Sequence, residues 1–144
     1  MRGKLRLPLA SSRGSHYNNG VMNVLVVDDS RIMRSIVKNA LRHHPKFTDV
    51  DCFEAGDGAE ALRLIEAHKI DLILLDWNMP LMNGMELVKK LREKGEHTQI
   101  PIIMITSESA KYNVIEAVKA GVNDYLVKPV SDKALIEKLD RLNL

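Results

Sequence analysis

The chain has 144 residues and a mass of 16.2 kDa, which suffices for one compact domain and excludes a long multidomain protein. Hydrophobic residues make up 45% and charged residues 28%, a balance that predicts a folded core and excludes an intrinsically disordered chain. No apolar run approaches the roughly 18 residues of a membrane helix, and the single cysteine, Cys52, excludes a disulfide framework and favours a reducing cytoplasm.

Residues 1–21 differ in composition from the rest of the chain. They hold four basic residues, no acidic residue and no apolar period, and Met22 stands where a natural start would be. We interpret them as a leader added for expression, the alternative being a native disordered arm. Because the formal charge of the whole chain is +2, residues 22–144 carry −2, which gives no electrostatic reason to expect nucleic-acid binding. The folded domain is therefore expected at residues 22–144.

From residue 23 onward, short apolar runs alternate with segments of helical period, a rhythm that predicts an α/β fold. The expected strands are Asn23–Val27, Val50–Ala55, Leu72–Leu75, Ile102–Ile105 and Asp124–Val127. The first, third and fourth are the most apolar, as strands covered on both faces should be. These three should form the centre of a parallel sheet.

Amphipathic helices are expected between the strands. The first is indicated by an apolar face of Ile32, Met33, Ile36, Val37, Ala40 and Leu41. The others are indicated by Leu62 with Ile65, Leu87 with Leu91, Val114 with Ile115 and Val118, and Leu135 with Leu139 and Leu142. Ser30 and Ser131 are expected N-caps, and Gly121 is expected in a left-handed conformation after the fourth helix. Five βα units predict a doubly wound sheet with a ligand crevice at the carboxyl ends of its strands.

Polar side chains stand where four of these strands end. Asp28 and Asp29 follow the first strand, Asp76 follows the third, Thr106 ends the fourth and Lys128 ends the fifth. Each alone has a structural explanation as a helix cap, a turn residue or a solvated side chain. Three carboxylates at one edge, however, repel one another by a few kcal/mol per pair at an effective dielectric constant of about 20, so a cluster needs a compensating cation or raised pKa values.

The residue types favour a hard cation and phosphoryl chemistry. Oxygen ligands suit Mg²⁺, Mn²⁺ or Ca²⁺ better than zinc, and Mg²⁺ fits best a site with few protein ligands. Asp76, from the central strand, is the candidate nucleophile toward a phosphoryl group, because aspartyl phosphate is an established covalent intermediate. Lys128 would hold phosphoryl oxygens as a point charge, and Thr106 would donate its hydroxyl to another.

The motifs together resemble those of response-regulator receiver domains over residues 22–144. They are the acidic pair in residues 26–30, the segment around Asp76 at residues 74–84, the hydroxyl in residues 105–107, and Lys128-Pro129. The resemblance implies a flavodoxin-like (βα)5 fold of strand order 2-1-3-4-5. It also implies magnesium bound by Asp29, by Asp28 through water, by Asp76 and by the backbone carbonyl of Asn78, and a phosphoryl group taken from a histidine kinase onto Asp76.

Finer details resemble the stand-alone chemotaxis type of this family. The resemblance implies that Asn78 and Glu108 tune dephosphorylation, that Tyr125 and Thr106 form a switch, and that Lys128-Pro129 is cis. It further implies a cytoplasmic monomer that is a signalling domain rather than an enzyme and that binds neither membrane nor nucleic acid. Its downstream target would be a flagellar motor switch protein or another protein. This target would bind the surface formed by the fourth helix, fifth strand and fifth helix. Val130 stands where Phe is frequent in the family. This difference changes the surface near the fifth helix, so the identity of the partner stays open.

Three other functions compete with this interpretation. An aspartate-nucleophile phosphatase needs a second Asp where Asn78 stands, and it needs a substrate-binding cap. A flavin-binding module needs a phosphate-cradling loop where Asp28 and Asp29 stand. The third alternative, a receiver domain excised from a larger regulator or hybrid kinase, shares the same chemistry and stays open. Elsewhere, His43 and His44 are expected to act as cations at the end of the first helix, and Cys52 as a buried small hydrophobe.

Overall fold

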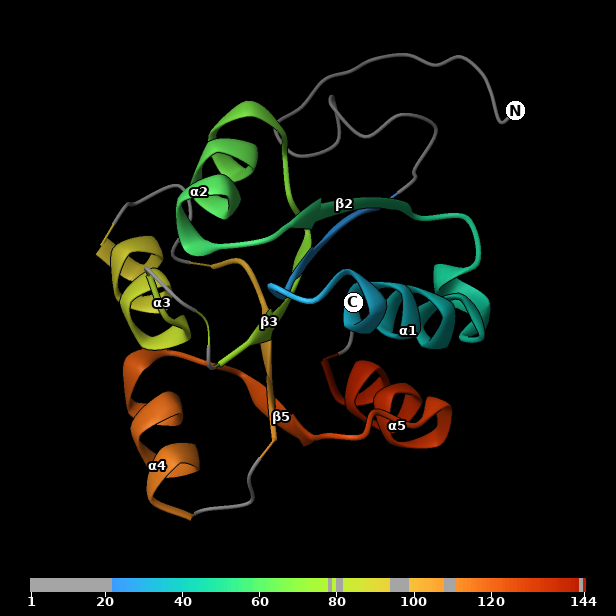
Figure 1. Cartoon of the computed structure of the whole chain (residues 1–144). Coiled ribbons are helices and arrows are strands. Elements are labelled where there is room, and N and C mark those ends of the chain that lie inside the picture. The colour runs from blue at the N-terminus through green and yellow to red at the C-terminus, as the bar shows by residue number, and fades with distance from the viewer. Residues whose placement is uncertain (1–21, 78, 80–81, 94–98, 108–110, 143) are drawn as a thin grey trace.

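The structure, a computed structural model, describes residues 22–77, 79, 82–93, 99–107, 111–142 and 144 (Figure 1). The expected leader at residues 1–21 lies outside the described residues. Five parallel strands form one sheet in the order β2-β1-β3-β4-β5. They are β1 (Asn23–Val27), β2 (Asp51–Ala55), β3 (Leu72–Asp76), β4 (Ile102–Thr106) and β5 (Asp124–Val127). The predicted doubly wound α/β fold and its strand order are confirmed.

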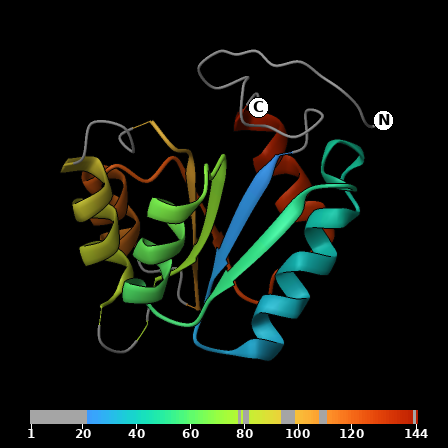
Figure 2. The same cartoon turned by 90° about the horizontal axis from the view of Figure 1, so that it is seen from above.

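Helices cover both faces of the sheet. They are α1 (Arg31–Arg42), α2 (Gly58–Ala67), α3 (Gly84–Glu93), α4 (Lys111–Ala120) and α5 (Asp132–Leu142), with a short 3₁₀ turn, η3, at Pro45–Phe47. Figures 1 and 2 show α1 and α5 on one face and α2, α3 and α4 on the other. Among the described residues, no helix is long and apolar enough to span a bilayer.

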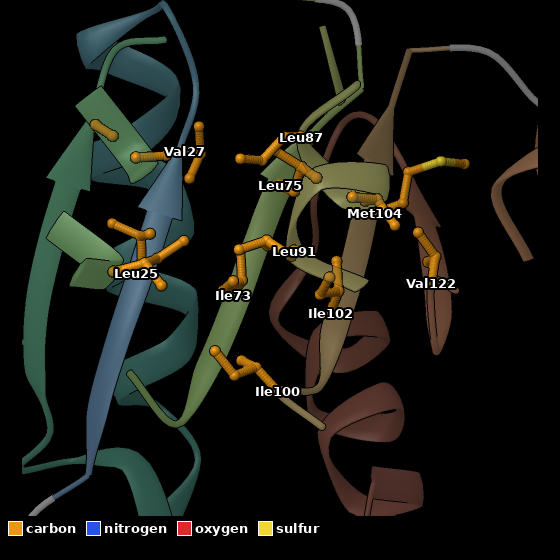
Figure 3. Packing of buried hydrophobic residues seen from close by; sticks show 14 of the residues in the cluster. Leu25, Val27, Ile73, Leu75, Leu87, Leu91, Ile100, Ile102, Met104 and Val122 are labelled. Carbon is orange, nitrogen blue, oxygen red and sulfur yellow. The ribbon is translucent and has the colours of Figure 1, made fainter. Parts of the chain in front are cut away.

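The alternating side chains of the strands build a separate core on each face of the sheet, as the period of two requires. Leu25, Ile73 and Ile102 pack toward α2, α3 and α4, and Figure 3 shows Ile73 and Ile102 beside Leu91 of α3. Val24, Leu72 and Ile103 belong to the second cluster, which includes buried residues of α1 and α5. Every residue of β3 and β4 is buried. The central strands are thereby held rigidly up to the edge where the polar residues stand.

The expected apolar face of the first helix is partly wrong. Val37, Ala40 and Leu41 are buried as predicted, but Ile32 is 73% exposed and Ile36 is 41% exposed. These two isoleucines lie four residues apart, on a line of the helix displaced by one residue from Val37 and Leu41, so they fall outside the stripe that reaches the sheet. A similar displacement leaves Ile115 and Val118 of α4 exposed while Ala117 is buried.

The helix ends follow the predicted chemistry. The Ser30 hydroxyl accepts a hydrogen bond from the Met33 N–H at 3.2 Å, and the Ser131 hydroxyl accepts one from the Ala134 N–H at 3.1 Å. Both expected N-caps are therefore confirmed. Cys52 is half-buried rather than fully buried, and this burial raises the pKa of its thiol.

The two histidines after α1 contact α5, which sequence reasoning did not anticipate. His43 pairs with Asp132 at the start of α5. The buried His44 ring places Nε2 2.7 Å from Asp140 Oδ1, and its Nδ1 accepts a hydrogen bond from the Lys46 N–H at 3.1 Å. These two side chains, which follow the last residue of α1, therefore connect α1 to α5 on one face of the sheet.

Gly121 closes α4 with a positive φ of 118°, as predicted. Its N–H donates to the Val118 carbonyl at 3.0 Å and the Val122 N–H donates to the Ala117 carbonyl at 3.0 Å, the bonding pattern of a Schellman motif. A Cβ built on Gly121 would lie 2.8 Å from Nε of Arg92, whose guanidinium donates to the Gly121 carbonyl. Both the backbone conformation and the space around it therefore require glycine.

Gly121→Ala should lower the free energy of unfolding by about 1–3 kcal/mol, because alanine is strained at this φ and its methyl group displaces Arg92. Urea denaturation followed by circular dichroism measures the change. Gly56→Ala is the matched control, since its Cβ would meet its nearest neighbours at 3.7 Å and should change stability by less than about 1 kcal/mol. Equal effects of the two substitutions would contradict this explanation.

Candidate functional site

Three carboxylates meet at the carboxyl edge of the sheet. One oxygen from each of Asp28, Asp29 and Asp76 lies within 4.8 Å of the other two. Asp28 and Asp76 are each only 3% exposed, whereas Asp29 is exposed. The predicted convergence of these residues is therefore found, and it combines two buried carboxylates with one that faces solvent.

Backbone hydrogen bonds of the sheet fix this cluster. The Asp28 N–H donates to the Ala55 carbonyl of β2 at 3.0 Å, and Asp28 Oδ1 accepts from the Ser30 N–H at 2.9 Å. Asp76 ends β3 in register with Ile105 of β4, and the next N–H, that of Trp77, donates to the Ile105 carbonyl at 2.9 Å. The carboxylates are close because parallel strands end together, not because they attract one another.

Lys128 supplies a positive charge between the two buried carboxylates. Its Nζ lies 3.3 Å from Asp76 Oδ1 and 3.5 Å from Asp28 Oδ2, and its side chain is 22% exposed. The Lys128 N–H donates to the Thr106 carbonyl at 2.8 Å, and the following peptide bond to Pro129 is cis, as predicted. Among the residues that the structure describes, one ammonium against three carboxylates gives an excess of negative charge.

The predicted switch residues lie on neighbouring strands beside this cluster. Thr106 is fully buried at the end of β4, and Tyr125 of β5 is half-buried and in register with Met104. Lys138 of α5 places its Nζ 4.7 Å from the centre of the Tyr125 ring and 3.0 Å from Asp124 Oδ1. Tyr125 is therefore held from the α5 side by a cation–π contact that no sequence pattern predicts.

The donor set fits a hard divalent cation. Carboxylate oxygens from Asp28, Asp29 and Asp76 are the ligand type that magnesium prefers, and three carboxylates within 4.8 Å of one another favour a cation. Asn78, the expected backbone ligand, and Glu108, the other expected tuning residue, lie outside the described residues. Magnesium thus remains a prediction that the geometry of the three carboxylates supports.

Sequence reasoning missed Arg34, which also touches the cluster. Its Nη1 donates to the Asp28 backbone carbonyl at 2.5 Å, and its Nε donates to Glu54 Oε1 at 2.8 Å. Glu54 lies on β2, at the edge of the sheet and in register with Val26 of β1. No local period or spacing indicates Arg34, because it lies on α1 and its partner Glu54 lies on β2.

Comparisons with known proteins agree with this geometry. A family model described as the response regulator receiver domain matches residues 24–140. The chain is 49% identical over 120 residues to the chemotaxis protein CheY1 of Helicobacter pylori, covering 83% of this chain and 94% of that protein. It is 48% identical over 120 residues to a chemotaxis protein CheY homolog of Campylobacter jejuni, covering 83% of this chain and 90% of that protein. The solved structure of Vibrio cholerae CheY4 matches with a TM-score of 0.76 at 34% identity, covering 85% of this chain and 98% of that chain.

Asp29→Asn should raise the free energy of unfolding of the metal-free protein by about 1 kcal/mol, because it removes one of three mutually repelling charges. Addition of MgCl₂ should stabilise the original chain and leave the variant nearly unchanged, since a ligand is lost. Urea denaturation in EDTA and in MgCl₂ measures both effects. Asp49→Asn, at another exposed carboxylate, is the control and should change stability by less than about 0.5 kcal/mol. Destabilisation by Asp29→Asn in EDTA would contradict charge repulsion at the cluster.

Proposed function

Because the chain belongs to the response-regulator receiver family and is a response regulator of a two-component system, we propose that Asp76 accepts the phosphoryl group. The observation that carries this proposal is the position of Lys128, whose Nζ lies 3.3 Å from a carboxylate oxygen of Asp76 within the cluster. A buried carboxylate beside an ammonium is suited to attack phosphorus, and the ammonium together with a cation on the two further acids would offset the added charge.

The proposed reaction is a transfer between two covalent linkages. An oxygen of Asp76 forms a bond to phosphorus while the bond from phosphorus to the imidazole nitrogen of a phosphorylated histidine kinase breaks, and the bonding electron pair stays on that nitrogen. Lys128 offsets charge on a phosphoryl oxygen, and the Thr106 hydroxyl donates to another once the group is attached. Magnesium held by Asp28, Asp29, Asp76 and the Asn78 carbonyl would neutralise part of the phosphoryl charge.

Phosphorylation would be transmitted by Thr106 and Tyr125 to the surface formed by α4, β5 and α5. The support is that three of the exposed large hydrophobic residues belong to these elements, Ile115 and Val118 to α4 and Val127 to β5. Val127 is in register with Thr106, so the proposed switch residue and the exposed surface are adjacent along the same strand pair. We assign this surface to the downstream protein partner.

The relatives named as chemotaxis proteins support a role for this chain in chemotaxis. In this role it receives phosphoryl groups from a histidine kinase and acts on a flagellar motor switch protein or a comparable protein target. A cytoplasmic location is part of the proposal, supported by the single cysteine. Asn78 and Glu108 complete it as the residues that tune dephosphorylation.

Incubation with acetyl phosphate and MgCl₂ should add about 80 Da to the intact mass, the mass of one phosphoryl group. Asp76→Asn should acquire no adduct, because an amide oxygen does not form the acyl phosphate. Reactions in EDTA should yield little adduct from either protein. A folded, magnesium-treated protein that gains no mass, or an Asp76→Asn variant that gains the same mass, would contradict the proposed role of Asp76.

Thr106→Val should still acquire the phosphoryl adduct but should lose the change in structure that follows it, because the hydroxyl that joins β4 to the phosphoryl group is gone. Amide hydrogen exchange in α4 and β5, measured with and without acetyl phosphate, reports this change. Thr106→Ser keeps the hydroxyl and should respond like the original chain. An unaltered exchange response in Thr106→Val would exclude Thr106 from the switch.

A further inference from the structure

Arg34 forms a link between the acidic cluster and the edge strand β2. It lies in the first turns of α1, and its side chain is only 14% exposed. The guanidinium donates to two groups at once, to the Asp28 backbone carbonyl through Nη1 and to Glu54 Oε1 through Nε. It contacts the backbone of the acidic pair, so its role differs from that of Lys128, whose ammonium faces the carboxylates.

Glu54 anchors the guanidinium from β2. Its second oxygen, Oε2, accepts a hydrogen bond from Lys38 Nζ at 2.6 Å, so one carboxylate joins two bases of α1. Hydrogen bonds from Lys38 and Arg34 lower the pKa of Glu54, because both stabilise its ionised form. Glu54 therefore fixes the Nε end of the guanidinium, and this leaves Nη1 directed at the backbone of the acidic pair.

The peptide unit between Asp28 and Asp29 is consequently oriented by Arg34. The N–H of Asp28 is already bonded to the Ala55 carbonyl of β2, and its carbonyl, which belongs to the next peptide unit, is bonded to Arg34. Fixing that carbonyl fixes the plane from which the Asp29 side chain extends. Asp29 is the exposed member of the cluster, so its carboxylate depends on the backbone for its position.

We propose that Arg34 is a positioning residue for the metal site and that it sets magnesium affinity by orienting the Asp28–Asp29 peptide. The inference rests on the proposed function, which assigns magnesium to this cluster. Residues that orient metal ligands typically change metal affinity by about 10- to 100-fold when they are replaced. The forked guanidinium matters here, because the single ammonium of lysine cannot make both hydrogen bonds from the same position.

The test is Arg34→Lys, which keeps the positive charge and removes the fork. Lys38→Met is the matched control, because it removes the other base bonded to Glu54 and leaves the contact with Asp28 intact. Magnesium binding is followed by the emission of Trp77, the sole tryptophan and the neighbour of Asp76. The rate of adduct formation with acetyl phosphate is then measured over a range of MgCl₂ concentrations.

Arg34→Lys should bind magnesium about tenfold more weakly and recover the original phosphorylation rate at saturating MgCl₂. Lys38→Met should bind magnesium with an affinity within about twofold of the original, whatever its effect on thermal stability. The inference is overturned if Arg34→Lys binds as tightly as the original chain, or if Lys38→Met weakens binding equally, since Arg34 would then be merely structural.

The same data separate this inference from the proposed function. If the original chain binds magnesium but gains no adduct, the role of Asp76 fails, while the affinities of the variants still decide the role of Arg34. If the original chain shows no magnesium binding by Trp77 emission or by thermal stabilisation, both fall together.

Discussion

The structure depends on one electrostatic conflict, the gathering of Asp28, Asp29 and Asp76 within 4.8 Å at the end of a parallel sheet. Two unit charges at this separation repel by roughly 3 kcal/mol at an effective dielectric constant of 20, and Lys128 offsets only part of it. The conflict is sustained because the carboxylates follow strands whose position is set by two hydrophobic cores and by the sheet hydrogen bonds. The packing and the hydrogen bonds of the sheet therefore keep the three carboxylates close together despite their mutual repulsion, and the resulting negative charge attracts cations.

Under the proposed function, phosphorylation changes this balance rather than creating a new binding site. It would add about −1.5 to −2 charges at Asp76, beside Lys128 and Thr106. Shifting a two-state equilibrium from 1:99 to 99:1 requires about 5.5 kcal/mol, which a few charge-assisted contacts can supply only where water is largely excluded. The low exposure of Asp76 and Thr106 meets that condition. Tyr125 would respond against a fixed partner, because Lys138 is itself held by Asp124.

The strands and the acidic cluster were predictable from the sequence because both depend on local patterns. Apolar runs fix the strands, and the parallel arrangement brings Asp28, Asp76 and Lys128 to one edge whatever the details of packing. The exposure of Ile32 and Ile36 was not predictable in this way, since the apolar residues of α1 occupy two neighbouring lines of the helix and packing decides which line faces the sheet. Contacts such as Arg34 with Glu54 or His44 with Asp140 join residues 20 and 96 positions apart, and no periodicity encodes them.

The two cationic side chains beside the cluster, Lys128 and Arg34, differ in the groups they contact: Lys128 faces carboxylate oxygens and Arg34 contacts a backbone carbonyl. A guanidinium on the carboxylates would bind them in a fork and occupy the oxygens that a metal ion needs, whereas Lys128 approaches Asp76 and Asp28 as a point charge, through one oxygen of each. Arg34 is kept from the carboxylates by Glu54, which anchors its Nε and directs Nη1 to the backbone of Asp28. The arginine can therefore fix the geometry of the site without neutralising it. Under this proposal, Glu54 on the edge strand β2 would influence a metal site at the centre of the sheet through Arg34, because positioning and charge compensation are assigned to different cations.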